Sequence, residues 1–523
     1  MSRAINRDEA MVPELELTVP EKAIGLLPIV LPILGTILLI MARIQTGRPI
    51  SDKYSDSEMW VMLALISYIC ASVLLVTNIF VKESILARLG LITVALGYCF
   101  NLTGWMVRWI EAGDKEGWKA GINGVWRYFP LDNLYALTLG FAAGAALTTL
   151  VVIRKPKYRA LGAMSMPILV VILALGMMLG SGISTLPPIL DSFWRPIHVS
   201  IATVGYGVCL VSFGLAFAYL LKDGVRFEGV ALWTALYGLL TFVMLGFGTA
   251  GAFQVFRGQY TVNLAMDKSS LPLRAELPMV GPLMALTLLV LIVAMVAFAL
   301  DHFNKDEIAR SWGWRFFHGA VVLQAVVLAV LFFQMKNLDN PAQHIPAREY
   351  PAFSVWMSEQ SQQSVTPEQA QTWAQQNQSS LKLSMNSNPV EFGALIGLFV
   401  ALFLVALFSW KRESLLSALP ELKTIDSLLY RTVGVAFPLL SLLLITGAVW
   451  ANESWGRYWG WDSKEVGALV AWMAYAGFLH TRIAHGWRGR RSAYFALLGF
   501  ALVIFTWLGV SFIIPGLHSY AGV

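Results

Sequence analysis

The hydrophobic positions of this chain fall into long unbroken runs, and polar positions collect between the runs. A helix of about 20 apolar residues crosses the hydrocarbon core of a bilayer, so we expect about 13 membrane-spanning helices. Long segments in which apolar and polar residues alternate, as in outer-membrane barrels, do not occur. The expected spans are 24–42, 59–81, 86–107, 134–153, 161–181, 198–221, 229–248, 279–300, 316–335, 391–409, 430–450, 466–482 and 494–514.

Composition supports the same class of protein. Of the 523 residues, 57% are hydrophobic and 13% are charged, whereas a soluble domain carries about 25% charged residues. Too few polar residues remain to cover a water-soluble globule. We therefore predict an all-α integral membrane protein, a polytopic helical bundle with short loops and one longer extracytoplasmic loop. The mixed charges before the first span and the lack of a small-residue cleavage site predict no cleavable signal peptide.

Basic residues between the expected spans indicate the orientation of the chain. They form three clusters on one side of the membrane, and such clusters mark the cytoplasmic side. We therefore expect a multi-pass protein of the bacterial inner membrane, with its N-terminus in the cytoplasm and its C-terminus outside. This arrangement largely accounts for the net charge of +6, so no nucleic-acid partner is indicated. The clusters are Arg154–Arg159, Lys411-Arg412 and Arg482–Arg491.

The cysteines do not indicate redox chemistry. Cys70, Cys99 and Cys209 all fall inside expected spans and form no CxxC pair. Neither a disulfide-exchange site nor a covalent haem site of the CxxCH kind is therefore predicted. We expect inert, buried thiols.

One long polar segment, 336–389, lies outside the membrane in this topology. It is rich in Gln, Ser and Asn, a composition that is more typical of a flexible linker than of a folded domain. Within it, Thr366-Pro367-Glu368 is a typical start of a short helix.

The strongest local signal is the aromatic segment, Trp450–Glu465, between two expected spans on the outer side. Five aromatic residues fall within a dozen positions and alternate with Gly, Asp, Lys and Glu. Gly456 and Gly460 let the backbone approach a flat partner, and indole rings offer apolar faces for stacking. The segment therefore predicts a site for a planar, hydrophobic, anionic ligand. An aromatic belt at the membrane interface is the alternative interpretation.

Histidines are the second signal, because imidazole is a common axial ligand of haem iron. There are seven in the chain. His198 opens a span at its outer end and His518 follows the last span, so both could reach one iron from either side of the aromatic segment. His480 lies about 15 residues beyond Glu465, which at 1.5 Å per residue places it near the inner face. A polar role at the interface is the alternative for each.

An ordered set of motifs in the last hundred residues resembles the CcsA family, the channel subunit of the system II cytochrome c synthase. Two weaker matches lie upstream, at Asp132–Tyr135 and at His198–Tyr206. The main motifs are Tyr430-Arg431, Gly447–Asn452, Trp455-Gly456, Tyr458-Trp459, Trp461-Asp462, Lys464-Glu465, Leu479–Arg482, Gly486–Arg491 and Gly516–Tyr520.

The resemblance implies a function in haem handling. In this family the tryptophan-rich segment, called the WWD domain, holds haem at the outer surface before thioether bonds join it to the CxxCH cysteines of an apocytochrome c. By position, His198 and His518 would be the axial ligands of non-covalently bound haem b, and His480 would bind haem on its way across the membrane. The residues of the aromatic segment implied in binding are Trp455, Trp459, Trp461 and Asp462.

The same resemblance implies partners and an activity. The chain would be a subunit of a cytochrome c synthase, or haem lyase, working with a ResB/CcsB-type partner subunit. A thioredoxin-like thiol reductant would keep the apocytochrome cysteines reduced. The residues leave the role of Asp462, Lys464 and Glu465 open between haem propionates and loop structure.

The chain also departs from the family pattern. Ser463 stands where the family usually has proline, and Ala136 stands where glutamate usually follows the tyrosine. We expect four segments, in which roughly 200 residues interrupt a CcsA-like core. These are the N-terminal transmembrane segment 1–132, the core halves 133–223 and 424–523, and the inserted transmembrane segment 224–423.

The insertion suggests a hypothesis about the inner side of the membrane. His318 starts a span near the cytoplasmic face, at a depth similar to that of His480. The insertion would then supply the second inner ligand that a separate partner subunit brings elsewhere. The alternative is an interfacial histidine beside Trp312 and Trp314, and His302 is a weaker candidate for the same role.

Three other functions stay open. The chain could be a haem exporter or carrier without ligation activity, or a WWD haem lyase subunit of the system I kind. It could also be an ion-coupled transporter or respiratory-complex subunit with a structural aromatic loop. Acidic residues in the middle of spans, which proton paths need, are scarce in this sequence.

Overall fold

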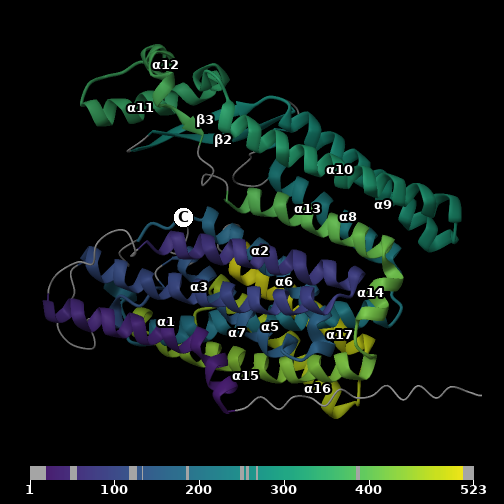
Figure 1. Ribbon diagram of the computed structural model, residues 1–523. Helices are drawn as coiled ribbons and strands as arrows, with labels where there is room; N and C mark the ends of the chain where they lie inside the picture. Colours follow the sequence, from purple (N-terminus) through teal and green to yellow (C-terminus); the bar gives the residue numbers. More distant parts are fainter. Residues whose placement is uncertain are drawn as a thin grey trace, which may run out of the picture.

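Helices from two separate parts of the described chain share one hydrophobic core, the main bundle (Figure 1). The computed structural model describes residues 19–46, 56–116, 126–131, 133–183, 188–247, 253–254, 258–266, 269–383 and 389–510. Within these residues the main bundle consists of α1 (Val19–Thr46), α2 (Ser57–Val81), α3 (Ser84–Glu116), α5 (Leu134–Ile153), α6 (Gly162–Met178), α7 (Trp194–Lys222), α15 (Leu422–Trp455), α16 (Ser463–Ala484) and α17 (Arg490–Ile504).

Helices α7 and α15 lie against each other along much of their length, although about 200 residues separate them. Small residues allow the close approach of α7 to its other neighbour, α5. A Cβ atom on Gly207 of α7 would lie 2.3 Å from the backbone nitrogen of Ala145 in α5. The chain between α7 and α15 therefore leaves the main bundle and returns to it.

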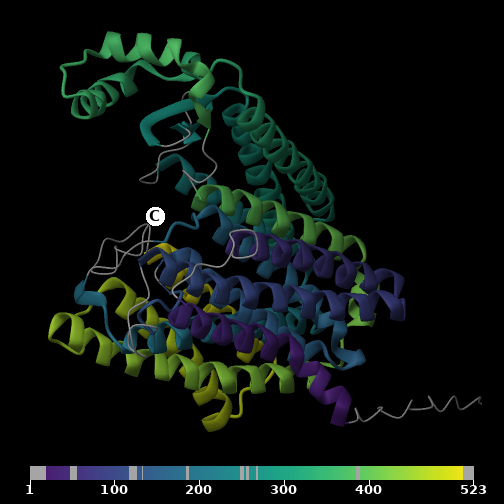
Figure 2. The ribbon, with the colours of Figure 1, turned by 60° about the vertical axis from the view of Figure 1, so that its left-hand side comes forward.

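The segment between α7 and α15 forms a second bundle with its own buried core. Helix α13 packs on α6 and so joins the second bundle to the main bundle (Figures 1 and 2). The helices of the second bundle are α8 (Phe227–Phe247), α9 (Val280–Asn304), α10 (Glu307–Asn337) and α13 (Pro389–Trp410), and α14 (Arg412–Ala418) links α13 to α15.

The structure confirms a polytopic helical membrane protein. Among the described residues, eleven helices are long and apolar enough to cross a membrane. Helix α16 does not meet that criterion, and in α1 only the shorter stretch Ile29–Ala42 is described as apolar. The expected number of about 13 spans therefore stays a prediction.

A small folded unit, here called the cap, extends from the second bundle at the end away from α14 (Figure 1). Its described strands form an antiparallel sheet in which β2 pairs with β1 and β4 along one edge and with β3 along the other. The sheet and two helices enclose a separate core. The elements are β1 (Phe253–Gln254), β2 (Gln259–Met266), β3 (Ser269–Leu277), α11 (Tyr350–Ser361), α12 (Pro367–Gln376) and β4 (Lys382–Leu383).

The cap corrects the interpretation of 336–389 as a flexible linker. Phe353, Ala370 and Ala374 are fully buried, because one face of each amphipathic helix packs inward while the polar residues stay in solvent. The predicted helix start is confirmed. The Thr366 hydroxyl accepts from the N–H of Gln369 in a capping box, directly before α12.

Short 3-10 and π-helical segments connect or extend the longer helices. The π-helix η7 continues α17 towards the functional site described below. These segments are η1 (Pro156–Leu161), η2 (Pro188–Leu190), η3 (Pro341–His344), η4 (Ala347–Glu349), η5 (Gln378–Ser380) and η7 (Phe505–Gly509).

Several of the predicted basic residues meet at one end of the main bundle. Arg490 pairs with Asp223 at the end of α7 (2.8 Å), and Arg482 pairs with Asp426 at the start of α15 (2.5 Å). His198 lies near the opposite end of α7, 24 residues before Lys222, a separation of about 36 Å along a helix. Which end faces the cytoplasm stays a prediction.

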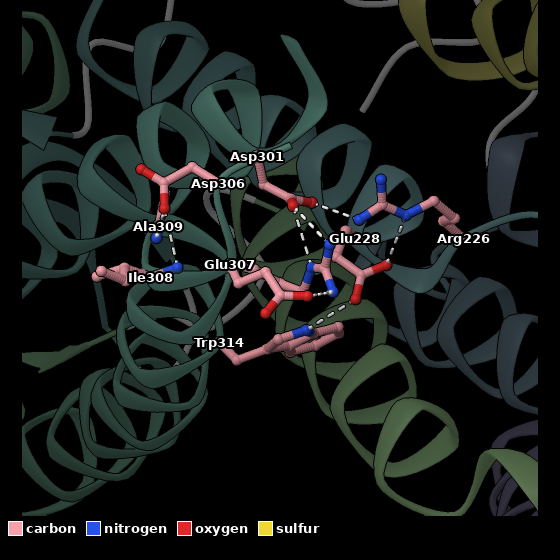
Figure 3. Close-up of polar contacts among 9 residues, drawn as sticks. Arg226, Glu228, Asp301, Asp306, Glu307, Ile308, Ala309 and Trp314 are labelled. Carbon is pink, nitrogen blue, oxygen red and sulfur yellow. Dashed lines mark hydrogen bonds and ion pairs between the residues drawn. The ribbon is translucent and has the colours of Figure 1, made fainter. Parts of the chain in front are cut away.

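An ion-pair network around one buried carboxylate lies at the corresponding end of the second bundle (Figure 3). The carboxylate of Asp301, at the end of α9, is fully buried and accepts from Arg226 (2.5 Å) and from Arg310 (3.0 Å). Arg226 also pairs with Glu228 (3.4 Å), which accepts from the indole N–H of Trp314. The network therefore ties the starts of α8 and α10 to the end of α9.

Candidate functional site

A cavity of about 160 Å³ lies between α5, α7, α15, α16 and η7. Most of its lining is apolar, with four tryptophans, one histidine, two cations and one carboxylate among its residues. Helix α7 lines it at helical spacing through Arg195, His198, Ala202 and Tyr206. The predicted histidine and the predicted aromatic segment therefore share one cavity, although about 250 residues separate them.

Two residues of α15 orient the imidazole of His198. Nδ1 lies 3.0 Å from the carbonyl oxygen of Leu443 and 3.4 Å from the hydroxyl of Thr446. A carbonyl can only accept, so Nδ1 carries a proton, and in the neutral imidazole Nε2 then has the lone pair with which imidazole binds iron. A Cβ atom on Gly447 would lie 2.7 Å from Cε1 of His198. The absent side chain at Gly447 is therefore what lets the ring lie against α15.

The tryptophans of the aromatic segment differ in burial. Trp450 is buried and its ring centroid lies 5.7 Å from that of His198. Trp455 and Trp459 are half-buried and line the cavity, and the rings of Trp450 and Trp455 are 6.2 Å apart. These three indoles give one side of the cavity the broad apolar faces on which a planar ligand can stack.

Trp461 lies outside the cavity lining. It is 73% exposed, has a left-handed backbone (φ +57°) and meets the Trp459 ring edge-on at 5.8 Å. A left-handed backbone is unusual for a bulky residue and occurs mainly where a turn or a functional site requires it. The structure therefore leaves the Trp461 ring in solvent beside Trp459.

Asp462 and Glu465 form a capping box at the start of α16. Asp462 accepts from the backbone N–H of Lys464, and Glu465 accepts from the N–H groups of Gly460 (2.8 Å) and Asp462 (3.1 Å). These contacts fix the turn that carries Trp459 and Trp461. These contacts favour a role in loop structure for the carboxylates of Asp462 and Glu465, rather than direct contact with haem propionates.

Sequence reasoning assigned no role to Arg195. Its side chain is 4% exposed, lines the cavity and donates to the carbonyls of Arg127 (2.7 Å) and Leu131 (3.3 Å). The signal that could have identified it is its position three residues before His198, on the same face of a helix. Lys464 lines the cavity from α16, and burial lowers its pKa to about 8.

The π-helix η7 forms another part of the cavity wall. It brings Thr506 and Trp507 into the lining, and Trp507 meets the ring of Phe141 edge-on at 5.2 Å. A Cβ atom on Gly467 would lie 2.8 Å from the hydroxyl oxygen of Thr506, so α16 and η7 approach closely there. Single π-turns in helices frequently mark functional sites.

Within the described part of the chain, the other predicted histidines are not in the lining of this cavity. His480 is exposed on α16, beside His485 (ring centroids 5.6 Å apart), and His318 is exposed on α10, beside Trp314 (5.8 Å). His302 is also exposed. His518 lies outside the described residues.

The structure does not bring His318 and His480 together. Helix α10 belongs to the second bundle, whereas α16 lies on the far side of the main bundle in both views (Figures 1 and 2). The reason is that the insertion packs its helices on one another and meets the main bundle through α13 and α6.

The fold and the cavity define a polytopic helical membrane protein with an aromatic-lined cavity near one end of its main bundle. The family described as "Cytochrome C assembly protein" matches residues 233–518, more than half of the chain. The chain therefore belongs to the cytochrome c assembly protein family. The matched region includes the aromatic segment.

Individual relatives resemble a shorter part of the chain. A cytochrome c biogenesis protein CcsA of Guillardia theta is 56% identical over 99 residues, which are 19% of this chain and 33% of that protein. The CcsA protein of Gloeobacter violaceus is 53% identical over 98 residues, 19% and 29% of the two chains. The chain thus spans about a third of the length of these relatives. A solved structure of "Cytochrome c Heme Lyase CcmF" has a TM-score of 0.29 and 15% identity, over 90% of this chain and 74% of that one.

Proposed function

We propose that the cavity binds haem b as a substrate and presents it for covalent attachment to the CxxCH motif of an apocytochrome c. The observation that carries this proposal is the meeting of His198 with Trp450, Trp455 and Trp459 in one cavity. Imidazole with a defined tautomer is suited to bind iron, and the indoles are suited to contact the porphyrin faces. Membership of the cytochrome c assembly family supports the same reading.

In this proposal His198 is one axial ligand, through Nε2. The second outer ligand is His518, which is proposed from the family resemblance alone. The reaction adds each cysteine thiol across a haem vinyl group. A carbon–sulfur bond forms, the thiol hydrogen goes to the terminal vinyl carbon, and no oxidant or reductant is consumed. The contribution of this chain is to hold haem, whose vinyl groups accept the thiols, in a fixed place and orientation.

We further propose that the chain is a CcsA-type subunit of a system II synthase in the bacterial inner membrane, with the cavity on the extracytoplasmic side. The high identity to CcsA proteins around the C-terminal motifs supports this. A ResB/CcsB-type subunit and a thioredoxin-like reductant would be its partners. His480 stays proposed as a ligand on the inner side, while the structure gives no support to pairing it with His318.

The test is maturation of a c-type apocytochrome that is co-expressed with this chain and its partner subunit. We expect a covalently haem-stained cytochrome with the wild type, and a loss of about tenfold or more with His198→Ala because an iron ligand is removed. His344→Ala, a histidine at the end of η3, is the matched control and should mature the client normally. Undiminished maturation by His198→Ala would contradict the proposal.

The same experiment separates the remaining candidate functions. A haem exporter or carrier would bind haem without forming the covalent product in any combination. A transporter or respiratory subunit with a structural aromatic loop would purify without haem. A system I-like lyase subunit would mature the client only with system I partners.

A further inference from the structure

We propose that Arg195 and Lys464 form an anion subsite within the cavity that binds the propionate carboxylates of haem. This inference rests on the proposed function and deepens it, because it defines the substrate as a tetrapyrrole with carboxylate side chains. It also sets the orientation of that substrate. With the carboxylate edge held by the two cations, the opposite edge of the macrocycle, which carries the vinyl groups, points away from them.

The first observation is that the two cations reach the cavity from different elements. Arg195 lies in the first turn of α7 and Lys464 in the first turn of α16, and both line the cavity. Glu465 is the acidic residue in the lining, and one of its carboxylate oxygens accepts from the backbone N–H groups of Gly460 and Asp462. Positive side chains therefore outnumber negative ones around an otherwise apolar space.

The second observation is that the Arg195 guanidinium is fixed in place. It is 4% exposed, and the carbonyls of Arg127 and Leu131 orient it. A guanidinium presents several donors in a planar fork that matches a carboxylate. The hydrogen bonds of Arg195 link α7 to the segment before α5. This structural role alone does not require that Arg195 also line the cavity.

The third observation is the place of the subsite relative to the iron ligand. Arg195 precedes His198 by three residues, about one helical turn, and both side chains line the cavity from α7. A substrate whose iron is bound by His198 therefore has its rim near Arg195. Burying a carboxylate without a partner is costly, so the charge of the two cations favours the propionate edge at this position.

The test compares haem with haem dimethyl ester, in which both carboxylates are blocked, as ligands of the purified full-length protein in detergent. We expect the wild type to bind haem about tenfold or more tightly than the ester, because charge-assisted hydrogen bonds are lost with the ester. Lys464→Met should reduce this preference by weakening haem binding alone. Lys423→Met, an exposed lysine at the start of α15, is the matched control and should keep the full preference.

A second variant, Arg195→Gln, should reduce the preference further, and a circular dichroism melt shows whether it is folded. Equal affinity of the wild type for haem and ester would overturn the subsite while leaving haem binding intact. A full preference in Lys464→Met would exclude Lys464 from the subsite. A wild type that binds neither ligand would instead overturn the proposed function.

The preference should also depend on pH. Because burial lowers the pKa of Lys464 to about 8, the ammonium is charged below this pH and neutral above it. The charged and titratable groups around it are Asp462 and Glu465 on its own segment, Tyr458 before α16, and Arg195, His198 and Tyr206 on α7. Any effect of pH on iron binding is common to haem and ester, so the ratio of the two affinities reports on the contacts with the carboxylates. This ratio should fall as pH rises through 8 in the wild type and should show no such step in Lys464→Met.

Discussion

The imidazole of His198 occupies space that any side chain at residue 447 would take. The Cβ of an alanine there would lie 2.7 Å from Cε1 and 3.1 Å from Nδ1 of His198. We expect Gly447→Ala to displace the ring, to break its hydrogen bond to Leu443 and to lower the haem content of the purified protein. Gly434→Ala on the same helix is the control, since nothing lies within 4 Å of its Cβ position. Equal haem content in the two variants would show that the ring position does not matter.

At the scale of single residues, the sequence predicts that a histidine and several tryptophans share a site, and the structure places His198 and three of the tryptophans in one cavity. That they bind haem stays a prediction, based on the suitability of these residue types for binding iron and stacking on a porphyrin. Asp462-Ser463-Lys464-Glu465 contains the spacing of a capping box, with an N-cap residue three before a glutamate, and this signal was available before the structure. The exposure of Trp461 was not predictable, because it depends on a left-handed residue inside an irregular turn.

Charged residues at the helix ends link α8, α9 and α10 of the second bundle. Replacing Asp301 by Asn removes the carboxylate shared by Arg226 and Arg310 (Figure 3). We expect a loss of about 1–3 kcal/mol, less than for a fully buried pair because both arginines are partly exposed. The thermal midpoint of the detergent-purified protein measures this loss.

Glu307→Gln is the matched control for that prediction. Glu307 pairs with Arg310 at 3.8 Å, but its side chain is 86% exposed, so its removal should change the midpoint little. A midpoint for Asp301→Asn that equals the control would mean that the network does not stabilise the bundle.

Long apolar helices were predictable because a bilayer demands runs of about 20 residues. The sheet of the cap was not predicted, in part because β1 and β4 have two residues each. The pairing of β4 with β2 depends on contacts between residues more than 100 positions apart, as between Leu264 and Leu383. Such contacts leave little pattern in the local sequence.

On the scale of the molecule, the main bundle, the second bundle and the cap have separate cores. Arg226 and Asp426 lie at corresponding ends of the second bundle and the main bundle. The cap follows the opposite end of α8, and the aromatic segment lies at the opposite end of α15. The cap and the cavity therefore belong to the same end of the molecule. The family resemblance predicted an insertion, but only the structure shows that it is a bundle with a folded cap.

Separate cores predict separate effects of mutation. Phe353 is fully buried in the cap, and replacing it by Ala should cost about 3–5 kcal/mol. We expect faster proteolysis within the cap while the haem content of the cavity stays unchanged. Val355→Ala on the same helix is the control, because Val355 is 59% exposed. A parallel loss of haem would show that the cap is part of the binding site.

In the proposed function, an imidazole on α7 and the indoles of the aromatic segment bind a single haem. The most direct measurement is the visible spectrum of the purified, reduced protein with and without His198, read again after imidazole is added. We expect His198→Ala to lose the sharp low-spin bands, and free imidazole to restore them by entering the vacated position. A spectrum of His198→Ala that matches the wild type before imidazole is added would contradict iron ligation by His198.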